Sequence, residues 1–109
     1  MQIPTEITFH GLDHSDAVEA SVQRWIARLE LFCDRITKCA VVVGRPHKRH
    51  RHGSDFVIQL LVDVPGAEIV AHAGHVDIYV AIADAFRAAK RQLHDRIDAR
   101  RSFAHAGAR

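Results

Sequence analysis

Apolar and polar residues alternate at the start of the chain and then change to a helical spacing. Residues 3–9 repeat with a period of two, which predicts a half-buried strand. After a break, apolar residues recur every three or four positions up to about Cys33, which predicts a helix with one buried stripe. Trp25 lies on that stripe and is expected to be a core residue. Either Asp13 or Ser15 can cap the start of this helix.

Three further segments are rich in β-branched residues and predict strands over residues 37–45, 54–64 and 68–73. Pro65 and Gly66 form a tight turn between the last two of these strands. A second helical stripe then runs over residues 77–101 and predicts a long helix that extends beyond the sheet. We expect one domain over residues 1–101, followed by a flexible tail over residues 102–109.

The predicted order is β-α-β-β-β-α, an α+β fold with a four-stranded sheet. The first two strands are joined through a helix, so a right-handed crossover should make them parallel. The last three strands are joined by short turns and should be antiparallel. Each helix has one apolar stripe, so both helices should cover the same face of the sheet.

Composition is ordinary for a globular protein, but charge is unevenly distributed. Hydrophobic residues make up 48% of the chain and the formal net charge is +2. Residues 1–34 hold six acids against two arginines, which gives −4, whereas residues 45–52 carry +4 and residues 87–101 carry six cations against two acids, again +4. Such segregation is typical of proteins that bind polyanions. No signal peptide or membrane-spanning run is recognisable, so we expect a cytoplasmic protein with no membrane partner.

The most unusual segment is GRPHKRHRHG, residues 44–53, which contains four cations, three histidines and no carboxylate. His47, His50 and His52 are weak candidate metal ligands, because the neighbouring cations oppose binding of a metal ion. Cys33 and Cys39 are expected to be free thiols in the core. No catalytic motif or phosphate-binding glycine loop is present, so we expect neither enzymatic activity nor a cofactor.

Phosphate binding is the chemistry that the cations favour most. Both helices cover one sheet face, so their basic rows can flank a single groove, and the arginines and lysine of residues 44–53 can extend it. Few aromatic residues remain for base stacking, which favours recognition of structured RNA through its backbone. The candidate RNA-binding residues are Arg24, Arg28, Arg45, Lys48, Arg49, Arg51, Arg87, Lys90, Arg91 and Arg101.

Four segments, in collinear order, resemble one protein family. They are MQIPTEITFHG (residues 1–11), LELFCDRI (residues 29–36), VPGAEIVAHA (residues 64–73) and DIYVAIADAFRAAKRQL (residues 77–93). The chain resembles the short ribosome hibernation promoting factor and ribosome-associated inhibitor family, also called sigma-54 modulation proteins. The resemblance implies a fold like that of double-stranded-RNA-binding domains. It also implies rRNA contacts at Arg28, Lys90, Arg91 and the Arg100–Arg101 end.

The same resemblance implies binding to the small ribosomal subunit in the decoding region, with inhibition of translation in stationary phase or stress. The dimerisation domain of the long form of the family has no counterpart, so we expect a monomer away from the ribosome. Two alternatives stay open from the residues. One is a metal- or pH-responsive interaction module built on His47, His50 and His52, and the other is a general structured-RNA-binding protein.

Overall fold

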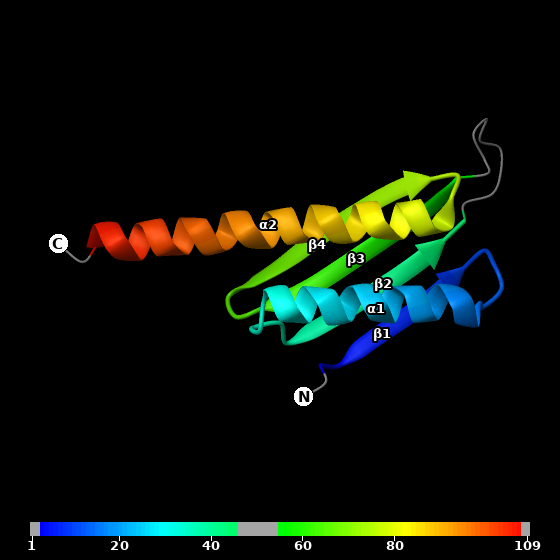
Figure 1. The fold of residues 1–109 in the computed structure, drawn as a ribbon, viewed down its shortest axis with the longest axis horizontal. Coiled ribbons are helices and arrows are strands. Elements are labelled where there is room, and N and C mark those ends of the chain that lie inside the picture. The colour runs from blue at the N-terminus through cyan, green and yellow to red at the C-terminus, as the bar shows by residue number, and fades with distance from the viewer. Residues whose placement is uncertain (1–2, 46–54, 108–109) are drawn as a thin grey trace.

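The computed structural model describes the backbone of residues 3–45 and 55–107, with side chains up to residue 96. Its elements follow the predicted order (Figure 1). They are β1 (Thr5–His10), α1 (Asp16–Phe32), β2 (Lys38–Gly44), β3 (Phe56–Val64), β4 (Ala67–His75) and α2 (Ile78–Gly107). Within the described ranges, no helix combines the length and apolar character needed to cross a membrane.

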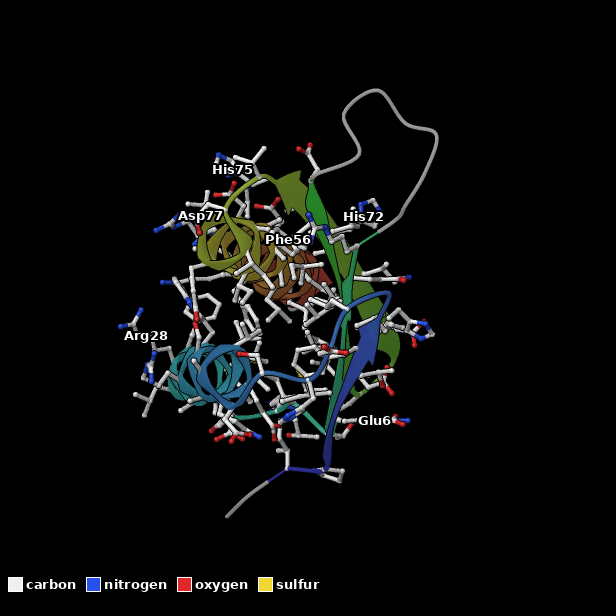
Figure 2. All side chains as sticks on the ribbon, turned by 90° about the vertical axis from the view of Figure 1, so that its right-hand side faces the viewer. Glu6, Arg28, Phe56, His72, His75 and Asp77 are labelled. Atoms are coloured by element: carbon white, nitrogen blue, oxygen red, sulfur yellow. The ribbon has the colours of Figure 1, made fainter. Side chains whose placement is uncertain are left out.

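The four strands form one sheet in the order β1-β2-β3-β4, and its pairing confirms the predicted topology. β1 is parallel to β2, whereas β2–β3 and β3–β4 are antiparallel. Figure 1 shows both helices in front of the sheet, and Figure 2 shows the same two layers edge-on, with one sheet face left open. The strand ends differ from the sequence prediction by one or two residues, as expected where ladders fray next to turns.

The core lies between the helices and the covered face of the sheet. The inward residues of β3, Ile58, Leu60 and Val62, are fully buried, while Val57 and Gln59 of the same strand face the open side. The predicted stripe of α2 is buried from Ile82 to Leu93. Burial of these apolar side chains supplies the main driving force for folding. The largest fully buried side chains are Phe86, Ile58, Leu60, Ile82, Leu93 and Val22.

Short polar residues set where the two helices begin. Ser15 rather than Asp13 caps α1, because the backbone N–H of Val18 donates to Ser15 Oγ at 3.2 Å. Asp77 caps α2 in the same way, with Oδ1 accepting from the backbone N–H of Tyr79 at 2.9 Å. Each cap satisfies donors that have no partner within the first turn of a helix.

The end of α2 corrects one sequence expectation. The helix continues to Gly107, beyond the predicted end at Arg101, so residues 102–107 are helical rather than a tail. Residues 102–106 contain no proline or glycine that would stop a helix, and Gly107 is the first such residue. At 1.5 Å per residue the 30 residues of α2 span about 45 Å. The helix therefore projects well beyond the sheet, as expected from the sequence (Figure 1).

Gly11, between β1 and α1, is a position where alanine should be poorly tolerated. Its φ is +78°, and a Cβ added there would lie 2.6 Å from the backbone oxygen of Arg45. We expect Gly11→Ala to lower the free energy of unfolding by about 2 kcal/mol or more, measured by urea denaturation. Gly66→Ala is the matched control, because Gly66 has φ +83° but open space around it. That control should cost only about 1 kcal/mol, and an equal loss in both variants would refute the steric explanation.

Candidate nucleic-acid interface

Five of the predicted RNA-binding residues lie on the outer surface of the helix layer. Their side chains are all exposed, because the spacing of the cations places them opposite the buried stripes. We call this set the basic helix face, and it consists of Arg24 and Arg28 on α1 and Arg87, Lys90 and Arg91 on α2.

The two rows of the basic helix face meet at Trp25. The indole ring is half-buried and stacks on Phe86 of α2, with ring centroids 5.9 Å apart and planes inclined by 19°. The guanidinium carbon of Arg28 lies 4.8 Å from the centroid of Trp25, and that of Arg87 lies 5.7 Å from it. Trp25 thus packs against the core, as predicted, but also carries one arginine from each helix.

Lys90 of α2 packs in a similar way over the aromatic ring of Phe32, at the end of α1. Its ammonium nitrogen lies 5.0 Å from the ring centroid of Phe32, which is half-buried. Each cation–π contact of this kind contributes about 0.5–1 kcal/mol at an exposed site. Sequence reasoning did not identify Trp25 and Phe32 as supports. The spacing of three between Trp25 and Arg28 on one helix was the available signal, since such residues are neighbours on a helix surface.

Most cations of the basic helix face have no acidic partner among the side chains that the structure describes. Among the described side chains, Arg87 alone in this set forms an ion pair, with Asp84 at 3.5 Å. Figure 2 shows Arg28 directed away from the sheet on the helix side, while Glu6 and His72 are directed from the open sheet face. The positive charge of the helix side is therefore available to an anionic ligand.

Arg45 lies apart from the Trp25 cluster, which consists of Trp25, Phe86, Arg28 and Arg87. It follows the last residue of β2, where its backbone N–H donates to the carbonyl of His10 at 3.0 Å and its guanidinium carbon lies 5.1 Å from the ring centroid of Phe56. The chain order places this end of the sheet beside the starts of α1 and α2, whereas Arg28 is in the second half of α1. The structure therefore does not bring Arg45 next to Arg28.

The remaining candidates lie outside the described residues. These are Lys48, Arg49 and Arg51, the weak metal candidates His47, His50 and His52, and the side chains of Arg100 and Arg101, whose backbone belongs to α2. Their roles stay predictions.

Metal and thiol chemistry has little support in the described part of the chain. No group of three His, Cys, Asp or Glu side chains is placed there to hold a metal ion. Cys33 and Cys39 are free and buried, as predicted, and burial raises the pKa of the Cys39 thiol to about 12. A thiol with such a pKa stays protonated at neutral pH and is a poor nucleophile or ligand.

His14, in the loop before α1, has a pKa raised above the usual value of histidine. Its Nε2 lies 2.6 Å from Oε1 of Glu19, and this hydrogen bond raises the pKa of His14, with a further contribution from Asp16. This hydrogen bond connects the loop to the first turn of α1, whereas Trp25 lies in the second half of the same helix.

Comparison with known proteins identifies relatives of this chain. Residues 5–101 match the family model described as sigma 54 modulation protein / S30EA ribosomal protein. A ribosome hibernation promoting factor from Azotobacter vinelandii is 38% identical over 76 residues, which cover 70% of this chain and 65% of that protein. The match thus spans slightly less than two thirds of the length of this relative.

Two solved structures share the fold. A ribosomal subunit interface protein from Coxiella burnetii superposes with a TM-score of 0.76 over 88% of this chain and 99% of its own, at 19% identity. The N-terminal domain of Protein Y from Thermus thermophilus gives 0.68 over 84% of this chain and 94% of its own, at 26% identity. These superpositions confirm the β-α-β-β-β-α architecture with both helices on one face.

Proposed function

Because this chain belongs to the sigma 54 modulation protein / S30EA ribosomal protein family, we propose that it is a ribosome-binding hibernation factor. Its relative from Azotobacter vinelandii carries the name ribosome hibernation promoting factor, which supports this function. The finer proposal is that the chain occupies the decoding region of the small subunit and inhibits translation in stationary phase or stress. It would then act in the cytoplasm as a non-enzymatic binder without a cofactor, and would be monomeric away from the ribosome.

The observation that best supports rRNA as the direct partner is the pair of arginines on Trp25. Arg28 and Arg87 come from different helices, yet both guanidinium groups lie within 6 Å of the same ring. Like charges repel each other, and a phosphate bound beside this ring would be attracted to both guanidinium groups. Guanidinium also binds phosphate oxygens in a bidentate geometry.

Backbone recognition fits the chemistry of the basic helix face better than base reading. Trp25 and Phe32 are half-buried and already covered by cations, so their rings offer little surface for stacked bases. Cations at fixed spacing on two helices suit the regular phosphates of a folded RNA. The proposed mechanism is steric: the bound domain occupies space that mRNA and tRNA require.

Salt dependence tests this function directly. Co-sedimentation of the full chain with purified small subunits should weaken steeply as potassium chloride rises from about 0.05 to 0.3 M, because bound cations displace counterions from RNA. Five phosphate contacts predict a slope of roughly −3.5 to −4.5 in a plot of log affinity against log salt. A flat response, or no binding at the lowest salt, would contradict the proposal. Equal affinity for an unrelated RNA duplex would instead favour a general structured-RNA binder.

A further inference from the structure

The outer edge of β1 has backbone groups that no other described strand uses. β1 is an edge strand of the sheet. The carbonyls of Pro4 and His10 accept hydrogen bonds from the N–H groups of Cys39 and Arg45, each at 3.0 Å, so even-numbered residues face β2. Because this direction alternates along a strand, the N–H and C=O groups of Thr5, Ile7 and Phe9 point away from the sheet. Such an edge can accept a further strand.

A groove lies beside this edge, between β1 and α1. One hollow of about 460 Å³ is lined by residues that include Ile3, Thr5, Ile26 and Ala27, and an adjoining hollow of about 520 Å³ shares Ile3 and Ala27. The small side chain of Ala27 leaves this space unfilled. Leu31, at the rim of the second hollow, is 90% exposed. We call the two hollows together the β1 groove. The volume of each hollow is within the roughly 300–1,000 Å³ typical of binding pockets.

The charge of the β1 groove is negative. Glu30 lines both hollows and Asp34 lines the second, and none of the described residues that line either hollow is a lysine, arginine or histidine. Residues 1–34, which supply most of the lining, carry a net charge of −4. This charge is opposite to that of the basic helix face, so one ligand does not suit both surfaces.

We propose that the β1 groove binds an extended, lysine- or arginine-rich segment of a partner protein, which adds a strand to β1. Backbone hydrogen bonds to Thr5, Ile7 and Phe9 would hold the added strand. Side chains alternate along a strand, so apolar residues of the segment would enter the groove over Ile26 and Ala27. The alternate cations would then lie on the open sheet face, beside the carboxylate of Glu6, and a cation flanking the apolar run would lie near the carboxylates of Glu30 and Asp34.

A second copy of this chain fits the same edge less well. Symmetric pairing of two β1 strands would bring the acidic sides of two molecules together, since Glu6 lies on β1 and Glu30 and Asp34 lie beside it. Like charges in close contact are destabilising, whereas a basic segment is complementary to this edge.

The test uses the full chain, labelled with ¹⁵N, and a capped peptide of about eight alternating valine and lysine residues as the probe. The peptide should shift the amide resonances of β1 and of residues 23–34, and should bind at least about tenfold more tightly than an alternating valine–glutamate peptide. N-methylation of the peptide backbone on the pairing edge should abolish binding, because the added strand loses its donors. Shifts confined to another surface, or equal affinity for both peptides, would overturn the proposal.

A substitution within the β1 groove provides the second part of the test. Ala27→Arg fills the hollow and adds a cation at an exposed helix position, so the affinity for the lysine peptide should fall by about tenfold or more. Ala17→Arg is the matched control, since Ala17 is exposed on α1 and lines neither hollow. Equal losses in both variants would show that net charge alone matters and would contradict the proposal. Sedimentation equilibrium provides the other check, because a dimer that Ala27→Arg disrupts would assign the edge to a second copy instead.

Discussion

Replacement of both Arg28 and Arg87 by alanine should lower the affinity for small ribosomal subunits by roughly 25- to 60-fold at about 0.1 M salt. Each phosphate contact accounts for about 0.7–0.9 in the slope of log affinity against log salt, so the loss of two contacts should also flatten that slope by about 1.4–1.8. Both arginines lie over Trp25 and are exposed on the helix side. Sedimentation binding curves at several salt concentrations measure both quantities.

Two comparison variants separate the charge from its support. Lys38→Ala removes a cation at the start of β2, outside the basic helix face, and should leave the affinity and the slope almost unchanged. Trp25→Leu keeps both arginines but removes the ring beneath them, so it should weaken binding without changing the slope. If Lys38→Ala alone reproduced half of the double variant's loss, the attraction would be non-specific and the proposed position of the phosphate would be wrong.

Phe86→Ala should be the most destabilising single substitution among those considered, with a loss of about 3–5 kcal/mol in the free energy of unfolding. Phe86 is 1% exposed and stacks on Trp25, so truncation leaves a cavity between the two helices. Domains of this size are stable by roughly 5–15 kcal/mol, so the loss is a large fraction of the total. Urea denaturation, followed by the fluorescence of Trp25, measures the change.

Leu31→Ala is the matched control for this core substitution. It also truncates a large apolar side chain on a helix, but Leu31 is 90% exposed. Its effect on stability should therefore stay within about 0.5 kcal/mol. A similar destabilisation by both variants would mean that Phe86 is not packed as described.

The two proposed sites divide the helix layer by charge. The basic helix face is proposed to bind RNA, and the β1 groove, on the neighbouring side of α1, is proposed to bind a basic protein segment. Gln23 lines the first hollow of the β1 groove, whereas its neighbour in sequence, Arg24, belongs to the basic helix face, because successive residues of a helix point about 100° apart. One helix can thus present opposite charges to two partners.

The order of the elements could be read from the sequence because the information is local. Periods of two and of 3.6 residues reveal which face of each strand or helix is buried, and they correctly placed Ile58 and Leu60 of β3 and Phe86 of α2 in the core. The parallel and antiparallel pairings followed from connection lengths. The exposed positions of Arg28, Arg87 and Lys90 followed in the same way, as the positions opposite the buried stripes.

Distances between elements were decided by the tertiary structure alone. Periodicity predicts that Trp25 and Phe86 face the core. Only the packing of α1 against α2 stacks the two rings and brings Arg28 and Arg87 to the ring of Trp25. The tertiary structure also separates Arg45 from the Trp25 cluster and leaves space beside Ala27 at the edge of β1. Local sequence encodes the direction in which a side chain points, whereas the spacing and angle of packed elements depend on how all the buried side chains fit together.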